Sequence, residues 1–328
     1  MAAGQSVTED LLLRPAQLGD LGSLVGEGGQ AKVYEVKRLS LVDAPGPLVV
    51  KLYRSGHAPP RGLRALVAKR NRLDPEAMAR LDSFAAWPLR VVEDRGAVCG
   101  VVLPLIPSSF FQARVLPGTG QRVRGPREVQ NLFVDPARAR FVGMPEPTFA
   151  QRLLVCRDFA SALHLLHKHE MVVGDINAKN ALFRLRDRPS VMLVDCDAIR
   201  IKGSMPVVRQ LNAPDWEPPE GSVLSQATDL YKFGLFVLRC LGPGQDVSTA
   251  RDPRRADAAL GVEGRNLLRA ALSVRPADRP AARDWGRYLD RRVAAALRPK
   301  SSVLRAPPEG TAPGWRRDPA SGAWRAVR

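Results

Sequence analysis

Hydrophobic and polar positions alternate along the N-terminal part of the chain as they do in strands. The stretch LGSLVGEGGQAKVYEVKRL and, after a DAPG turn, PLVVKLY carry this alternation through residues 21–53. Residues 61–82 have the apolar spacing of one or two helices, and AAWPLRVV with GAVCGVVLPLI predicts a strand pair joined by an EDRG turn. We therefore expect a mainly antiparallel sheet accompanied by helix in this part.

The pattern becomes helical from residue 148. Apolar residues recur at helical spacing in FAQRLLVCRDFASALHLLHKH, ATDLYKFGLFVLRCLG, VEGRNLLRAALS and AARDWGRYLDRRVAAAL. Two short apolar stretches that contain carboxylates, MVVGDINAKNALF and VMLVDCDAI, follow the first of these helices. Residues 108–146 are basic and are predicted to be loop-rich with few apolar anchors, either an insertion or a substrate-facing surface. Residues 299–328 are rich in Pro, Gly and Arg and are predicted to form a flexible tail.

The composition allows a folded core but indicates no anionic polymer as partner. The chain has 328 residues, of which 45% are hydrophobic and 25% charged, and a formal net charge of +17. Most of the positive charge is arginine scattered along the chain, without a long basic run or a basic strip interleaved with aromatic residues. We interpret the charge as a basic surface and expect no specific nucleic-acid site.

The cysteines and the apolar stretches predict a cytoplasmic protein without membrane contact. The four cysteines stand far apart among apolar residues, which is typical of reduced, mostly buried thiols. The stretch AVCGVVLPLI is too short to cross a bilayer. The N-terminal residues lack the basic start and the long apolar core of a signal peptide.

The segment GEGGQAKVY places Gly26, Gly28 and Gly29 between two predicted strands. A Rossmann or P-loop site would need a helix directly after the glycines, whereas a glycine-rich hairpin lets backbone N–H groups close over phosphates. Lys51 follows in an apolar strand, where a buried ammonium needs an anionic partner. The alternative is a lysine that extends to the surface, but its position behind the glycine-rich hairpin favours a phosphate contact.

Polar residues also interrupt the two later apolar stretches. Asn180 and Asp195 carry oxygen atoms that can bind a hard cation such as Mg²⁺, and Asp175 would lie nearby to accept a proton or to orient a hydroxyl nucleophile. Asp197 is either a further metal ligand or an acid at the end of a strand. A role in holding Mg²⁺ and the reacting groups explains why these polar residues lie beside strands that should be buried.

Taken in order, these motifs resemble those of the bacterial, eukaryotic-like Ser/Thr protein kinases, in a divergent branch. In that branch the catalytic loop reads GDxNxxN and the metal-binding DFG motif reads DxD. The resemblance spans roughly residues 20–292. It implies nucleotide binding by Gly26, Gly28, Gly29, Val33, Lys51 and Leu182, a catalytic role for Asp175, and metal binding by Asn180 and Asp195. It also implies structural support by Glu220, Asp229 and Arg279.

The resemblance implies an α+β, two-lobed fold. We expect an N-terminal extension at residues 1–19 and a kinase-like domain at residues 20–298. Within it, a small β-rich lobe would cover residues 20–106 and a larger, mainly helical lobe residues 107–298. ATP and Mg²⁺ are the implied cofactors, and a protein with Ser or Thr hydroxyls is the implied substrate.

One family feature has no counterpart in the sequence. Protein kinases pair the strand lysine with a helix glutamate, yet no acid lies between Tyr53 and Asp74, and Glu76 is the first candidate. Either the helix is displaced or Lys51 pairs differently, and a regulatory partner would then set the position of residues 61–82. Two alternatives to a protein kinase are a nucleotide-binding pseudokinase and a small-molecule kinase of the aminoglycoside or choline phosphotransferase type.

Overall fold

The computed structural model describes most of the chain, in segments. The described residues are 6–8, 11–58, 62–116, 118–144, 146–201, 213–221, 223–298, 314–317 and 324–327. The chain divides into two compact units, Met1–Ala296 and Leu297–Arg328. In the second unit Gly314–Arg317 (β15) pairs antiparallel with Trp324–Val327 (β16). The other residues of the predicted tail, 299–313, 318–323 and 328, lie outside the described residues. The flexibility of the tail therefore stays a prediction.

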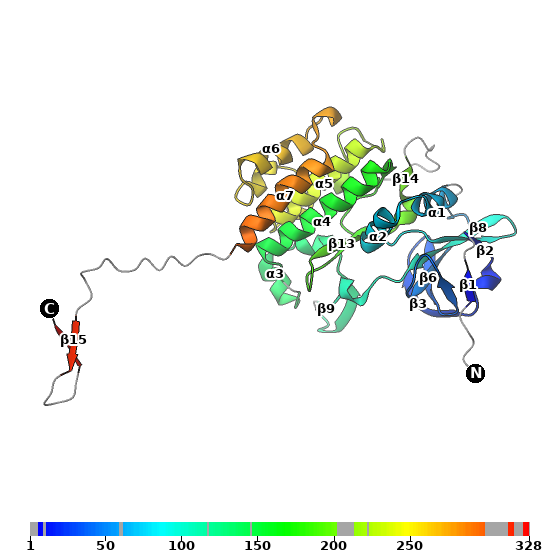
Figure 1. Cartoon of the computed structure of the whole chain (residues 1–328), viewed down its shortest axis with the longest axis horizontal. Coiled ribbons are helices and arrows are strands. Elements are labelled where there is room, and N and C mark those ends of the chain that lie inside the picture. The colour runs from blue at the N-terminus through cyan, green and yellow to red at the C-terminus, as the bar shows by residue number, and fades with distance from the viewer. Residues whose placement is uncertain are drawn as a thin grey trace. The chain divides into compact units, whose positions relative to one another are not determined.

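A six-stranded sheet makes up the β-rich end of the first unit (Figure 1), in the order β2-β7-β8-β6-β4-β3. All neighbours are antiparallel except β2 with β7. The strands are Leu12–Leu13 (β2), Leu21–Glu27 (β3), Ala31–Val36 (β4), Leu48–Tyr53 (β6), Arg90–Asp94 (β7) and Ala97–Pro104 (β8). Beside the sheet, Ser6–Thr8 (β1) pairs parallel with Leu39–Leu41 (β5). The antiparallel sheet expected from the alternating pattern is therefore confirmed.

Two helices follow β6, as the spacing of residues 61–82 predicts. They are Leu63–Asn71 (α1) and Pro75–Phe84 (α2), and Asp74 caps α2 by accepting a hydrogen bond from the Ala77 N–H. Leu63 and Val67 of α1 pack on Val91 and Val101 of the sheet. The apolar face of α1 thus covers the sheet beside β7 and β8.

Arg70 fixes the two helices to each other and to the strand region. Its guanidinium is fully buried and donates to the Asp82 carboxylate on α2 and to the Asp43 carboxylate after β5. A buried cation needs such anionic partners because it has lost its water. On the other side, Arg80 of α2 forms an ion pair with Asp158 at 3.0 Å.

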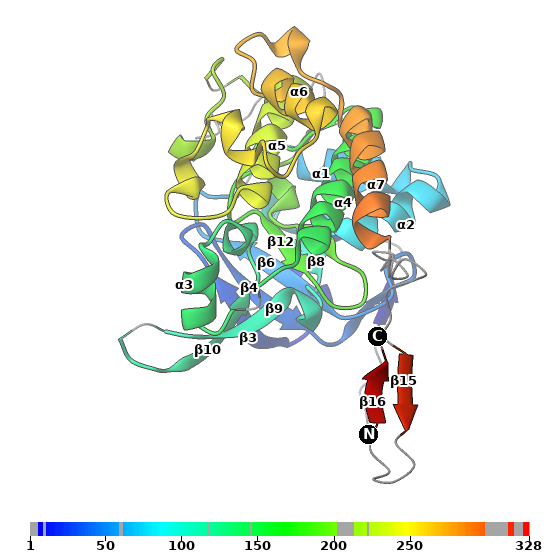
Figure 2. The same cartoon turned by 90° about the vertical axis from the view of Figure 1, so that its left-hand side faces the viewer.

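Four long helices form most of the other end of the unit, so the α+β fold expected from the sequence is confirmed (Figure 2). They are Phe149–Lys168 (α4), Gln226–Leu241 (α5), Val262–Ala271 (α6) and Ala282–Leu297 (α7). Capping boxes begin two of them, at Thr148 for α4 and at Ser225 for α5. Short antiparallel pairs lie beside them, formed by Met171–Val172 (β11) with Arg200–Ile201 (β14) and by Ala181–Arg184 (β12) with Ser190–Leu193 (β13).

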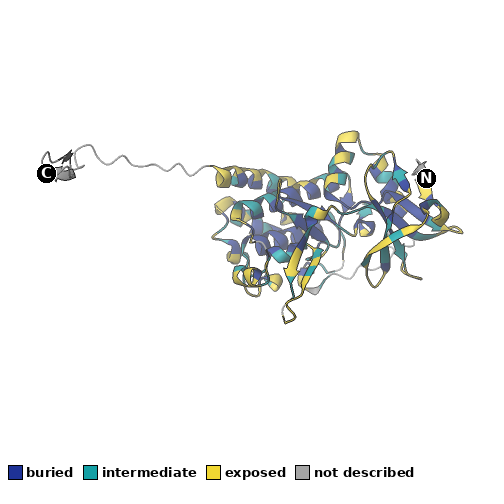
Figure 3. Ribbon diagram, turned by 90° about the horizontal axis from the view of Figure 1, so that it is seen from below, coloured by how far each residue is buried: buried dark blue, intermediate teal, exposed yellow. Residues whose placement is uncertain are grey.

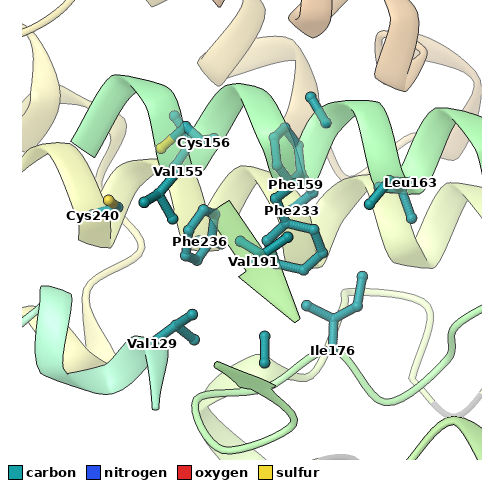
Figure 4. Packing of buried hydrophobic residues seen from close by; sticks show 14 of the residues in the cluster. Val129, Val155, Cys156, Phe159, Leu163, Ile176, Val191, Phe233, Phe236 and Cys240 are labelled. Carbon is teal, nitrogen blue, oxygen red and sulfur yellow. The ribbon is translucent and has the colours of Figure 1, made fainter. Parts of the chain in front are cut away.

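Helices α4 and α5 lie at the centre of the main hydrophobic core (Figure 4). Phe159 of α4 packs against Phe233 and Phe236 of α5, with ring centroids 5.6 and 5.0 Å away in edge-to-face geometry. Figure 3 shows buried residues filling the interior of the helical end and of the sheet. This packing fixes α4 and α5 relative to each other.

Residues 108–146 contain more regular structure than the sequence analysis expected. Phe111–Val115 (β9) and Arg122–Pro126 (β10) form an antiparallel hairpin, and Pro136–Phe141 (α3) is a short helix. Val129, Leu132 and Phe133 belong to the main core. These three closely spaced apolar residues anchor the segment in a core formed largely by distant helices.

Among the described residues, none of the helices combines the length and the apolar character that a bilayer crossing requires.

Candidate functional site

Three of the predicted nucleotide-binding residues lie in one row across the sheet. The register of β3 with β4 pairs Gly26 with Val33, and the register of β4 with β6 pairs Val33 with Lys51. Directly opposed residues of neighbouring strands project on the same face of a sheet. Gly26 on β3 and Lys51 on β6 therefore project on the same face of the sheet, with Val33 on β4 between them.

The turn after β3 has room for a ligand next to its backbone. The Gly28 N–H closes the turn with the Ala31 carbonyl at 2.9 Å. A Cβ atom added at Gly28 or Gly29 would meet no atom within 4 Å, and neither glycine adopts a positive φ. Neither backbone strain nor crowding by this chain accounts for these glycines, and their exposed backbone is open to a ligand.

Lys51 is largely buried and bonded to two carboxylates. Its Nζ donates to Asp195 Oδ1 at 2.9 Å and to both oxygens of Asp197, at 3.0 and 2.9 Å. Only 14% of the lysine side chain is exposed. Burial works to lower the pKa of Lys51, but the charges of Asp197 and Asp195 outweigh it and raise that pKa. Lys51 is thus a fixed cation inside the site, not a lysine that extends to the surface.

Tyr53 supports the same cluster from the same strand. Residues two apart on a strand share a face, and the Tyr53 hydroxyl donates to Asp197 Oδ2 at 2.7 Å. Burial, together with the negative charge of Asp197, raises the pKa of Tyr53, so its hydroxyl stays a donor at neutral pH.

The structure shows which acidic residues pair with Lys51. Of the two possibilities, Lys51 pairs differently: its partners are Asp195 and Asp197, while Glu76 is exposed in the first turn of α2. For Asp197, the two expected roles were metal ligand and strand-end acid. The structure gives it a third one, as the buried partner of Lys51 and Tyr53.

The loop before β12 holds the Asp175 carboxylate with two carboxamides. Asn177 Nδ2 donates to Asp175 Oδ1 at 2.9 Å, and Asn180 Nδ2 donates to Asp175 Oδ2 at 2.7 Å. The Asn177 side-chain oxygen in turn accepts from the N–H groups of Lys179 and Asn180, which shapes the loop as an Asx turn. Asp175 is therefore oriented before any substrate binds.

Strand pairing brings the two predicted metal ligands together. Asn180 precedes β12 and Asp195 follows β13, and these strands pair antiparallel with Ala181 opposite Leu193. The Val194 N–H donates to the Asn180 carbonyl at 3.0 Å, closing this end of the hairpin. Asp195 adopts a left-handed conformation with φ of 54°, which is uncommon outside glycine and is found at functional sites.

Asp175, Asn180 and Asp195 line a common pocket, together with apolar residues that include Phe159 and Ile176. The Asn180 NH₂ group donates to Asp175, so the amide oxygen of Asn180 points away from Asp175. The side chain of Asp195 is 57% exposed. Mg²⁺ in phosphoryl-transfer sites takes one or two protein carboxylates and completes its shell with phosphate and water oxygens. Asp195 and Asn180 are a donor set that fits this chemistry.

Helix α5 supports the backbone of the Asp175 loop from below. The buried Asp229 carboxylate accepts from the N–H groups of Val173 and Gly174, both at 2.8 Å, and contacts His167 Nε2 at 3.0 Å. One turn later, the buried Lys232 ammonium donates to the Gly174 carbonyl. Burial lowers the pKa of Lys232. Asp229 is a residue that the family resemblance assigns to structural support, whereas Lys232, in the same TDLYKFG stretch, carries no such signal in the sequence.

The other predicted residues occupy supporting positions. Arg279 donates to both oxygens of Glu220, at 2.6 and 2.7 Å. Leu182 is buried in a small cluster with Phe110 and Met192, at the strand between Asn180 and Asp195. The residues that sequence reasoning did not assign are Tyr53 and Lys232, and the only signal for Tyr53 was its position two residues after Lys51.

Comparison with known proteins finds similarity to proteins that are named as kinases. No family model matches the chain. It is 28% identical over 231 residues to the protein kinase YegI of Escherichia coli strain K12, a match that covers 68% of this chain. It is 26% identical over 168 residues, 45% of this chain, to a calcium and calcium/calmodulin-dependent serine/threonine-protein kinase of Oryza sativa subsp. japonica. The chain spans about a third of the length of these curated relatives, 31% and 33% respectively.

Proposed function

We propose that this protein transfers the γ-phosphoryl group of ATP, with Mg²⁺, to Ser or Thr hydroxyls of a protein. The observation that carries the proposal is the position of Asp195. Its carboxylate bonds to Lys51 at 2.9 Å and lines a common pocket with Asp175 and Asn180. A buried lysine, two side chains with oxygen atoms and an oriented carboxylate thus meet within one site, and this arrangement supports phosphoryl transfer.

The roles of the residues follow from their chemistry. Bound Mg²⁺-ATP supplies the phosphoryl group and the metal charge that neutralises it. Lys51 would contact phosphate oxygens, and the turn at Gly28 and Gly29 would cover them with backbone. Asp195 and Asn180 would hold the metal through oxygen atoms. The catalytic contribution of such fixed charges is that they need no reorganisation during the reaction.

Asp175 would orient the acceptor hydroxyl. Its two carboxylate oxygens accept hydrogen bonds from Asn177 and Asn180, which fixes the direction of their remaining lone pairs. A hydroxyl that donates to one of these lone pairs is aligned for attack. Asp175 would take its proton as the new O–P bond forms and the bond from the γ-phosphorus to the leaving ADP breaks. Asn177 carries no charge, so the positive charge beside the transferred group would come from Lys51 and the metal.

A protein acceptor is favoured over a small molecule by the helical part of the chain. The Glu220–Arg279 pair and the Asp229 contacts to the loop match features of the protein-kinase helical lobe. The named relatives are protein kinases. We propose the cytoplasm as the compartment, since it supplies ATP and keeps cysteines such as the four unpaired ones here reduced.

The test is incubation of the protein with Mg²⁺ and γ-labelled ATP, alone, with a generic protein substrate, and with small alcohols and amines. The proposal expects label on protein Ser or Thr, and little label when Asp175→Asn replaces the wild type. Label on a small acceptor alone would make the protein a small-molecule kinase. ATP binding without transfer to any acceptor would make it a pseudokinase.

A further inference from the structure

We propose that Asp197 is the residue that positions Lys51, in the role that a helix glutamate has in protein kinases, with Tyr53 orienting Asp197. This inference rests on the proposed function and adds to it the origin of the lysine's partner. The sequence offers no acid in residues 54–73 for this purpose. The structure brings one from 146 residues away in the chain.

The two acids that contact Lys51 are not equivalent. Only 6% of the Asp197 side chain is exposed, against 57% for Asp195. Asp197 receives the ammonium on both of its oxygens, whereas Asp195 receives it on one. A buried carboxylate without its cation is strongly destabilised, so Asp197 restrains Lys51 far more tightly than the exposed Asp195 does.

This difference assigns the two acids to separate tasks. When Asp195 turns to a metal ion, Lys51 loses one hydrogen bond but keeps the two from Asp197. Lys51 therefore stays in place while a nucleotide binds. A single residue separates Asp195 from Asp197. The short 3₁₀ turn Cys196–Ala198 therefore links the proposed metal ligand, Asp195, directly to Asp197, the partner of Lys51.

The contacts of Asp197 argue against its other candidate role, metal binding. Its Oδ2 already accepts from both Lys51 and Tyr53, and its Oδ1 accepts from Lys51. Its side chain faces strand β6 and supports the lysine instead of the metal.

One consequence concerns the helices after β6. Lys51 is held without any contribution from α1 or α2, and buried Arg70 and the Arg80–Asp158 pair fix these helices to both ends of the unit. Movement of a helix would then not be required to assemble the lysine site. The regulatory partner predicted to set the position of residues 61–82 stays an untested prediction, and this geometry assigns it no task at Lys51.

The experiment compares Asp197→Asn with Glu76→Gln, which removes the first acid of the helices and touches none of the site. Calorimetry measures the affinity for Mg²⁺-ATP and for adenosine, and kinetics measure kcat and its dependence on Mg²⁺ concentration. Asp197→Asn should weaken Mg²⁺-ATP binding about tenfold and leave adenosine binding unchanged, because only phosphates meet Lys51. Loss of a supporting contact of this kind reduces kcat about 10- to 100-fold. Glu76→Gln should match the wild type in every measurement.

A second variant covers the case in which Asp197→Asn does not fold. Tyr53→Phe keeps the carboxylate and removes only the 2.7 Å hydrogen bond that orients it. It should reduce the preference for Mg²⁺-ATP over adenosine in the same direction, by a few-fold. Unchanged preference in the folded variants would overturn the inference.

The remaining outcomes separate this inference from the proposed function. A higher Mg²⁺ requirement in Asp197→Asn would identify Asp197 as a metal ligand and overturn the inference alone. If the wild type binds ATP but transfers nothing, the proposed function fails, while the ratio of ATP to adenosine affinity still decides the role of Asp197. A wild type that binds no ATP overturns both.

Discussion

Arg279 donates hydrogen bonds to both carboxylate oxygens of Glu220, at 2.6 and 2.7 Å, although 59 residues separate them in the chain. The guanidinium also stacks over the Tyr231 ring, 5.0 Å from its centroid. Burial works to raise the pKa of Glu220, but Arg279 outweighs it and holds that pKa below its ordinary value of 4.5. This pair ties the segment before α5 to the segment before α7.

Glu220→Gln should therefore destabilise the protein in a pH-dependent way. The pKa of Glu220 is lower in the folded than in the unfolded state, so its contribution is complete above about pH 4.5 and is lost as the pH falls through the folded-state pKa. We expect a loss of about 1–3 kcal/mol at neutral pH from the weakened charge-assisted pair. Denaturant unfolding of wild type and variant across a pH series measures the difference. A difference that stays constant into strong acid would contradict the assignment.

Asp229→Ala should damage both stability and activity. The substitution leaves the buried N–H groups of Val173 and Gly174 without their acceptor, which we expect to reduce the free energy of unfolding by about 2–5 kcal/mol. The loop that carries Asp175 would lose its orientation at the same time. Chemical unfolding and phosphoryl-transfer rates check this, with the exposed Asp290→Ala on α7 as the control, expected within about 0.5 kcal/mol of wild type. Equal unfolding curves for the two variants would rule out the bracing role.

Cys196 should not react with alkylating reagents in the folded protein, with or without Mg²⁺-ATP. Its side chain is 1% exposed, and burial, with the charges of Asp197 and Asp195, raises the pKa of its thiol. Cys99 is only half-buried, so we expect it to react first. Mass spectrometry of the labelled protein distinguishes the sites. Labelling of native Cys196 ahead of Cys99 would contradict the packing described here.

The sequence was informative where a pattern is local. The spacing of apolar residues predicted α4 and α5, and alternation predicted β3, β4 and β6. The order of short motifs also singled out Lys51 and Asp195, which the structure brings to within 2.9 Å. In each case the relevant signal is a periodicity or a residue type within one short segment.

The sequence was not informative where distant segments meet. Nothing in the sequence around Lys51 indicates that its buried partner is Asp197, because that contact depends on how the sheet packs against the turn after β13. The sequence gives Lys232 no role beyond that of a residue in an apolar helix. Its hydrogen bond to the Gly174 carbonyl is visible only in the structure. The sequence of residues 108–146 predicts loop because it contains few apolar residues. Two of them, Val129 and Leu132, are nevertheless completely buried.

The most direct test of the central claim, that Lys51 and Asp195 belong to a phosphoryl-transfer site, is single-turnover transfer from Mg²⁺-ATP by Lys51→Met and Asp195→Asn. Each variant removes a fixed charge contact, so the account predicts a rate at least about a hundredfold below wild type. Melting temperature and circular dichroism serve as controls for folding. A rate near that of the wild type in either folded variant would contradict the account.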